Sequence, residues 1–252
     1  MLLVDAPAAW ITAADPAAAA IAGIDALRAS IAATENAALF FPYLNLVGIE
    51  GPTPGAARVL TVAPSGSIAG IIARLDGWSG VWNAPAGPAA SLNAVTDLST
   101  QLTDQQTDAL NRLGINCLRG FAGKGNLVWG SRTLQGAADY ASEWKYIQVR
   151  RLALFIEESI RQNIGWVAFE PNDAQLWSAL RDEVGSFLQD LFSKGAFQGL
   201  AAQDGYFVKC DASTTTQSDI DAGEVNIIIG FAPLKPAEFV IISLTQITDS
   251  YA

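Results

Sequence analysis

Neighbouring acidic residues could supply acid–base chemistry at three places: Glu157 with Glu158, Asp182 with Glu183, and Asp219 with Asp221. Carboxylate catalysis needs two groups that converge on one substrate, one of them acting as the acid. Neighbouring positions on a helix point in different directions, so carboxylates placed in this way are usually solvated. We therefore interpret all three pairs as surface charges and predict no catalytic residue.

The chain contains no histidine among its 252 residues. Because His is the commonest general base near neutral pH and a frequent metal ligand, this excludes Ser-His-Asp, Cys-His and His–metal chemistry. The two cysteines, Cys117 and Cys210, cannot make a Cys/His zinc site without His, and we expect half-buried, reduced thiols. The turn around Lys124 lacks the glycine spacing of a phosphate-binding loop. We predict no cofactor and no metal.

Composition and charge exclude further classes of protein and of binding partner. Half of the residues are hydrophobic and 16% are charged, which is typical of a globular chain with one large domain or two intimate ones. A net charge of −10 disfavours contact with nucleic acid and with anionic membranes. We find no apolar run long enough for a signal peptide or a membrane span. We expect no nucleic-acid or membrane partner, and a protein made and kept in the cytosol.

Strands and helices alternate in the first half of the chain, and these elements must position any functional residue. The predicted strands and helices there lie at residues 2–4, 15–33, 37–41, 67–75 and 104–113. Asp15 and Pro16 are suited to the first positions of a helix. A loop at 48–54 is rich in Gly and Pro. Residues 77–88 carry two Trp, which indicates an ordered loop at a partner surface or a boundary between lobes.

The second half begins with a hairpin and continues with two long helices and three strands. We expect these elements at residues 115–118, 127–129, 143–163, 172–195, 206–210, 224–230 and 238–247. Asn172 and Gln175 have the spacing of a capping box at the start of the second long helix. The fold class predicted is therefore α+β (α/β), with a mixed sheet flanked by helices and a smaller C-terminal lobe.

The last predicted strand has an unusual pattern. It is apolar without interruption at its start and alternates afterwards, which is typical of a buried base that continues into a half-exposed end. Such a strand can pair with a neighbouring subunit, although it could also be an ordinary internal strand. Its candidate linking residues are Glu238, Phe239, Val240, Ile241, Ile242, Ser243, Leu244, Thr245, Gln246 and Ile247.

Several strings, taken in order, resemble those of the contractile tail sheath family of phages, R-type bacteriocins and related injection particles. They are GVWNAP at 80–85, GIN at 114–116, VWGSRT at 128–133, EWKYIQVRRL at 143–152, FEPN at 169–172, FVKCD at 207–211 and APLKPAEFV at 232–240. The resemblance covers residues 39–248. Asn83 departs from it, since a basic residue is expected there.

The resemblance implies a fold and a mode of assembly. It implies a partial core lobe at residues 1–114, a C-terminal lobe at 115–252, and a linking strand at 237–248. Family subunits are joined by strand exchange, in which N- and C-terminal arms of neighbours complete a shared sheet. They usually carry an N-terminal arm before the point at which this chain begins, so we expect this chain to supply only one of the two arms.

The function that the resemblance implies is mechanical and not enzymatic. Many copies would form a helical sheath around an inner tube and contract to drive the tube through an envelope, with baseplate and terminator proteins as further partners, in a virion tail or a phage-like particle. The candidate contacts to the tube or a neighbour are Lys145, Arg150 and Arg151, which could equally form a solvated face or pair with Glu143 or Glu170. The alternatives are a monomeric binding module and a carboxylate-dependent enzyme.

Overall fold

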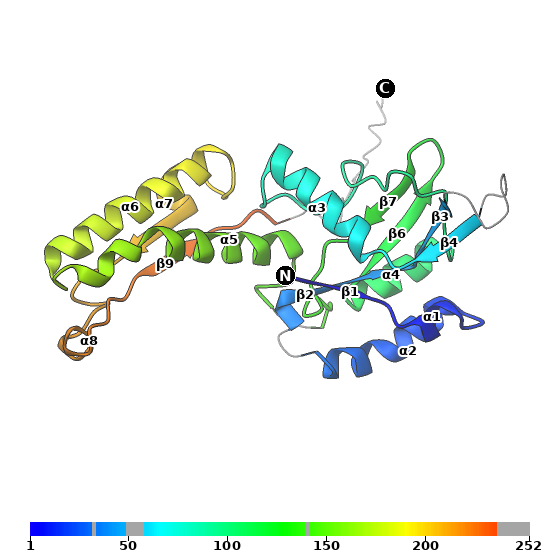
Figure 1. Cartoon of the computed structure of the whole chain (residues 1–252), viewed down its shortest axis with the longest axis horizontal. Coiled ribbons are helices and arrows are strands. Elements are labelled where there is room, and N and C mark those ends of the chain that lie inside the picture. Colours follow the sequence, from blue (N-terminus) through cyan, green and yellow to red (C-terminus); the bar gives the residue numbers. More distant parts are fainter. Residues whose placement is uncertain (32–33, 49–57, 140–141, 236–252) are drawn as a thin grey trace, which may run out of the picture.

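The computed structural model describes residues 1–31, 34–48, 58–139 and 142–235. Its elements gather into a larger part that precedes helix α5 (Ile147–Asn163) and a smaller part that begins with α5 (Figure 1). Helix α5 extends from the larger part into the smaller one. The predicted α+β class, with a mixed sheet flanked by helices, is confirmed.

A four-stranded sheet forms the centre of the larger part. Its order is β1-β2-β6-β7, and its strands are β1 (Leu2–Asp5), β2 (Ala37–Phe41), β6 (Ile115–Phe121) and β7 (Gly125–Trp129). The first three strands are parallel, and β7 returns antiparallel to β6. All five residues of β2 are buried. This explains the continuous apolar run in the sequence, because a strand covered on both faces needs apolar residues at every position.

Helices cover both faces of this sheet. Helices α1 (Ala8–Ile11), α2 (Pro16–Ala29) and α4 (Asp104–Arg112) lie on the face that receives Leu39 and Phe41. Helix α3 (Ser65–Ser79) lies on the face that receives Phe40. The short helix η1 (Thr34–Asn36) precedes β2. Successive residues of β2 therefore enter two separate cores, as the alternation of side chains along a strand requires.

A second, antiparallel sheet was not predicted. Its order is β4-β3-β5, with strands β3 (Leu44–Gly48), β4 (Arg58–Val62) and β5 (Asp97–Leu98). The sheet was missed because the Gly and Pro residues near 48–54 indicate a loop, and the strands on either side of them are short. Most of the predicted loop lies outside the described residues.

The predicted boundary after residue 114 stays a prediction. The pairing of β2 with β6 crosses this position, with Leu39 opposite Ile115. Residues 115–129 therefore belong to the same sheet as β1 and β2.

The smaller part is a two-stranded antiparallel sheet covered by two long helices. Its strands are β8 (Tyr206–Lys209) and β9 (Ile228–Phe231), and its long helices are α5 and α6 (Ala174–Ser193). The short helices η2 (Gly165–Phe169), α7 (Ala202–Gly205) and α8 (Gln217–Ala222) connect these elements. The core between helices and sheet contains Leu152, Ile156, Val184, Leu188 and Leu191.

The residue that caps α6 differs from the prediction. The N-cap is Asp173, whose carboxylate accepts hydrogen bonds from the backbone N–H groups of Gln175 and Leu176. Asn172 instead accepts a hydrogen bond of 2.8 Å from the Trp177 indole. Asp and Asn serve equally well as N-caps, so the composition of this segment could not decide between the two positions.

The loop at 77–88 lies between the two parts, as expected. Val81 and Trp82 pack against the core of the smaller part. Trp78, in contrast, is 78% exposed at the end of α3. The loop therefore ties the larger part to the helices α5 and α6 through one of its two Trp residues.

Candidate functional site

Helix α5 is anchored firmly where it leaves the larger part. The Ser131 hydroxyl donates a hydrogen bond to the buried Gln148 side chain in the first turn of α5. Nearby, the buried Asn116 amide bonds the carbonyls of Leu39 and Arg132, which fixes the segment before α5 against the sheet. Buried polar groups that are fully satisfied specify one arrangement. The direction of α5 is therefore set by the core of the larger part.

The three predicted contact residues lie near this anchor. Arg150 donates a 2.7 Å hydrogen bond to the Asn36 side chain, and its guanidinium lies 4.8 Å from the ring centroid of Trp144. Arg151 pairs with Asp76 on α3. The Lys145 ammonium lies 5.3 Å from the ring centroid of Tyr146. The internal partners of the two arginines are thus Asn36 and Asp76, and not the predicted Glu143 or Glu170. A role of the three residues at another chain stays a prediction.

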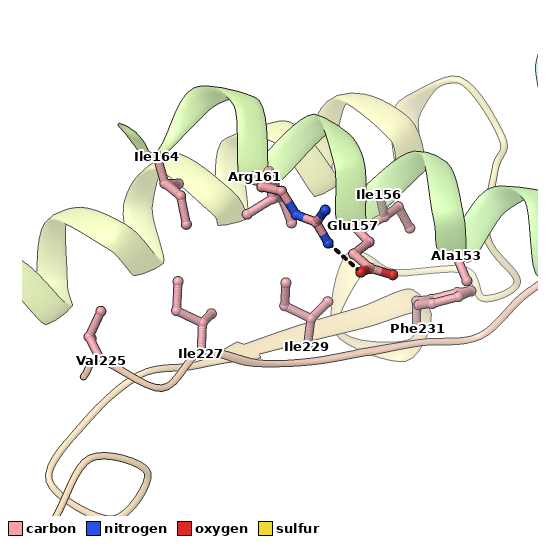
Figure 2. A pocket seen from close by; sticks show the side chains of 10 residues that line it. Ala153, Ile156, Glu157, Arg161, Ile164, Val225, Ile227, Ile229 and Phe231 are labelled. Atoms are coloured by element: carbon pink, nitrogen blue, oxygen red, sulfur yellow. Dashed lines mark hydrogen bonds and ion pairs between the residues drawn. The ribbon is translucent and has the colours of Figure 1, made fainter. Parts of the chain in front are cut away.

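An apolar groove of about 500 Å³ runs between α5 and the strand segment that ends in β9 (Figure 2). On the helix side it is lined by Ala153, Ile156, Ile160 and Ile164, which recur every three or four residues and so share one face. On the strand side it is lined by Val225, Ile227, Ile229 and Phe231, which alternate and so share one face. The groove thus presents two apolar walls facing each other.

One ion pair lies among these apolar side chains. Arg161 donates a 2.8 Å hydrogen bond to Glu157 and lies 3.7 Å from Glu158. The side chains are 67% exposed for Arg161 and 58% exposed for Glu157. Exposed pairs of this kind contribute little to stability. The pair therefore borders the groove without closing it, and Glu157 serves as the partner of an arginine.

No strand of the described residues pairs with the edge of β9 beside the groove. Within the described residues β9 pairs with β8 alone. Ala232, which follows β9, donates a hydrogen bond to Gly205 next to β8. Because backbone groups alternate sides along a strand, the N–H and C=O groups of Ile229 and Phe231 face away from β8. The groove therefore combines an apolar lining with unpaired backbone groups, which is what an added strand requires.

The chain leaves β9 in an extended course. Ala232 accepts a 2.8 Å hydrogen bond from the Gln198 backbone, and the Gln198 side chain donates one of 2.8 Å to the Pro233 carbonyl. Phe197 and Pro233 form an isolated antiparallel bridge. Figure 1 shows the chain continuing from β9 toward the larger part. The predicted linking strand, residues 238–247, lies outside the described residues.

Glu183 and Asp219, from the other two acidic pairs, have structural partners. Glu183 accepts a 3.0 Å hydrogen bond from the Trp166 indole. Thr216 is the N-cap of α8, and Asp219 completes its capping box; hydrogen bonds from Thr216 lower the pKa of the Asp219 carboxyl group. A general acid needs a raised carboxyl pKa, so the shift at Asp219 has the opposite sign. Asp182 lies one position before Glu183 on the exposed face of α6.

Both cysteines are more deeply buried than expected. Burial raises the pKa of the Cys117 thiol to about 12 and also raises that of Cys210. Among the described residues, no three His, Cys, Asp or Glu side chains are grouped so as to hold a metal ion. None of the described helices has both the length and the hydropathy that a membrane crossing requires.

The groove was not predicted from the sequence, although both of its walls were. The helix at 143–163 and the strand at 224–230 were each predicted, and in the helix Ile156 and Ile160 lie four residues apart, as one apolar face requires. The alternation from Val225 to Phe231 was a further signal for one apolar face. What the sequence did not contain was the distance between the two elements, because it depends on how α5 and α6 pack on the sheet.

Comparisons with known proteins match this arrangement to one group. The model of the phage tail sheath C-terminal domain family matches residues 139–247. The tail sheath protein of Vibrio phage KVP40 is 31% identical over 180 residues, which are 71% of this chain and 26% of that protein. The chain spans about a quarter of the length of the curated relatives it matches.

Solved structures of similar fold cover more of the chain. The helical sheath of the anti-feeding prophage, in its contracted state, is 31% identical with a TM-score of 0.75, over 98% of this chain and 70% of that chain. The sheath complex of the extracellular contractile injection system PVC, also contracted, is 32% identical with a TM-score of 0.77, over 90% of this chain and 60% of that chain. These similarities include both the larger and the smaller part.

Proposed function

This chain belongs to the family of tail sheath proteins, and from that premise we propose that it is a structural subunit of a contractile sheath. Its copies would join in a helical array around an inner tube, in a virion tail or a phage-like particle. Contraction of that array would drive the tube through a target envelope. Baseplate and terminator proteins would be further partners at the ends of the sheath, and assembly would take place in the bacterial cytoplasm.

The observation that carries the proposal is the groove between α5 and β9. A connection between subunits must survive large rotations, and strand pairing can persist while rigid bodies turn. Among residues 1–31, 34–48, 58–139 and 142–235, nothing pairs with the outer backbone groups of β9, which are available for such a strand, and the two apolar walls would bury its side chains. The C-terminal segment Glu238–Ile247 of another copy fits this need, since its first half is apolar.

The bonds that fix α5 to the larger part also suit a link between subunits. Pulling on a strand held in the groove would act on α5 and β9, and the bonds of Gln148 and Arg151 connect α5 to the larger part. Because α5 is fixed to the larger part, a force on the groove would move the whole subunit. If α5 were attached flexibly, the same force would only bend the connection between the two parts.

The proposal can be tested by filling the groove. Ala153 lines it opposite Phe231, so an Ala153→Trp substitution adds bulk there without deleting a core side chain (Figure 2). The control is Gln162→Trp, which places the same ring on the exposed surface of the same helix. Wild type and both variants would be examined by sedimentation and electron microscopy, alone and with the cognate tube protein, beside a chain cut after Pro236.

We expect rings, tubes or binding to the tube for wild type and for Gln162→Trp. Ala153→Trp and the cut chain should lose them while staying folded. Tubes formed equally well by all four proteins would contradict a linking role of the groove. A stable monomer in every case, indifferent to the tube, would favour a monomeric binding module.

A further inference from the structure

We infer that the outer face of the β8–β9 sheet is a second contact between copies of this chain, and that Leu200 of the copy that donates the linking strand packs on it. The outer face consists of Phe207 and Lys209 on β8 and of Ile228 and Gly230 on β9. The inference rests on the proposed function, because the copy that covers this face is the one whose strand enters the groove.

The two faces of this sheet are covered unequally within the chain. Figure 2 shows Ile229 and Phe231 pointing toward α5. Ile228 and Gly230 alternate with them and so point to the opposite side. On that side Phe207 is 56% exposed and Ile228 is 49% exposed. A side chain at Gly230 would overlap the Phe207 ring, so the glycine lets this ring lie across β9. The outer face is therefore an apolar surface that the rest of the chain leaves half exposed.

The linking strand itself requires a cover on this side. Its first half, Phe239–Ile242, is apolar at every position. Because side chains alternate along a strand, half of these residues would face α5 and the other half would extend the outer face. A strand that is apolar on both sides is typical of a sheet covered on both sides. Without a cover, the widened outer face would be a large contiguous apolar patch, which marks an interaction site.

The length of the connection identifies the copy that covers the outer face. Phe239 follows Lys235, the last residue that the structure describes, by four positions. Even a fully extended chain of that length spans only about 14 Å. The body of the donating copy must therefore lie beside the groove of the copy that receives the strand. On the receiving copy, α5 and α6 already cover the helix side of the sheet, so the donating copy meets the outer face.

Leu200 is the apolar side chain that the donating copy offers at this point. Its loop binds the outgoing chain, because the backbone N–H and the side-chain amide of Gln198 donate hydrogen bonds to the carbonyls of Ala232 and Pro233. Gly199, with a φ of 114°, then turns the loop. Leu200 beyond this turn is fully exposed, so it contributes nothing to the core of its own chain. Against the outer face of a neighbour, the same side chain would be removed from water.

Cross-linking between chains that carry one new cysteine each tests this contact. Ala201→Cys places a thiol beside Leu200, and Lys209→Cys places one on the outer face. The two variants are mixed with a short bis-maleimide, alone and with the cognate tube protein. We expect cross-linked dimers in the mixture and not in either variant by itself, since both native cysteines are buried. The control mixture replaces Lys209→Cys with Gln162→Cys, which is exposed on the helix side, and should give no dimers.

Substitution of Leu200 gives the energetic test. Because Leu200 is fully exposed, Leu200→Ser should leave the urea midpoint unchanged, whereas the concentration needed for assembly should rise about tenfold. Gly230→Ala displaces the Phe207 ring and should raise that concentration as well. The two effects should not add in the double variant, because both remove the same contact. Gln203→Ser, exposed on α7, is the matched control and should assemble like the wild type.

The outcomes separate the inference from the proposed function. Assembly without a cross-link between the Ala201→Cys and Lys209→Cys chains, or equal assembly of Leu200→Ser and wild type, would overturn the second contact and leave strand linking in place. Protection of Lys209→Cys from maleimide only when the tube protein is present would assign the outer face to the tube and would also overturn it. No assembly and no cross-link in any mixture would contradict the inference and the proposed function together.

Discussion

Arg151 on α5 holds Asp76 on α3 through two charge-assisted hydrogen bonds, one of which measures 2.9 Å from Nη1 to Oδ1. The side chains are only 15% and 28% exposed. Partial burial makes such a pair stronger than an exposed one. This contact joins the helix that carries the groove to the larger part of the molecule.

Replacing Asp76 with Asn should weaken this junction. The substitution leaves the partly buried Arg151 guanidinium without its charged partner, and we expect the free energy of unfolding to fall by about 1–3 kcal/mol. The measurement is urea denaturation at pH 7. Asp190→Asn is the control, since its pair with Lys194 is more than half exposed and should be worth under about 0.5 kcal/mol. Equal losses in the two variants would contradict the assigned role of Asp76.

The N-cap of α6 gives a second prediction. Asp173→Ala leaves two backbone N–H groups without their acceptor, and the free energy of unfolding should fall by about 1 kcal/mol. Glu170→Ala, outside the helix and exposed, serves as the control. A stability loss in the control but not in Asp173→Ala would show that the helix begins elsewhere.

Thiol chemistry should report the burial of the cysteines. With a pKa of about 12 at Cys117, only about one thiol in 10,000 is ionised at pH 8. Both cysteines are also shielded from solvent. An aromatic disulfide reagent should therefore leave the native protein unmodified for hours and label both thiols at once in denaturant. Rapid labelling of the native protein at pH 8 would contradict this packing.

Acid should weaken the end of the smaller part through Asp219. Its carboxyl pKa is lowered in the folded state by hydrogen bonds from Thr216. The resulting stabilisation is present above the ordinary carboxyl range and is lost as the pH falls through the folded-state pKa. Urea midpoints between pH 7 and pH 2 should therefore fall less steeply for Asp219→Asn than for wild type. Ser218→Ala, on the same helix, should follow the wild-type curve. Identical curves for all three proteins would exclude this contribution.

The elements that local patterns specify were predicted well. The apolar run at Ala37–Phe41 is short and is followed by Pro42, which favours a strand, and the buried residues of α6 recur every three or four positions, which favours a helix. The hairpin of β6 and β7 was recognised from its glycine turn, although both strands extend further than predicted. Strands β3 and β4 were missed because the Gly- and Pro-rich segment between them was interpreted as a loop alone, without the strands that flank it.

The candidate site also depends on contacts between distant parts of the chain, which the sequence pattern does not contain. Both walls of the groove were predicted as separate elements, but the space between Ile160 and Ile229 is a property of packing. The first two arginines of α5 were predicted to contact the tube or a neighbouring subunit, and this stays a prediction. Their partners Asn36 and Asp76 lie far away in the sequence, and only the fold brings them together.

The central claim is that the groove beneath α5 receives a strand from another copy. It is tested most directly by a cryo-electron microscopy reconstruction of the assembled particle, at a resolution that traces the backbone. We expect a third strand paired with β9 in the groove, with Phe239–Ile242 between the apolar walls, continuous with the chain of a neighbouring subunit. An empty groove, or one filled by the same subunit's own C-terminal segment, would contradict the account.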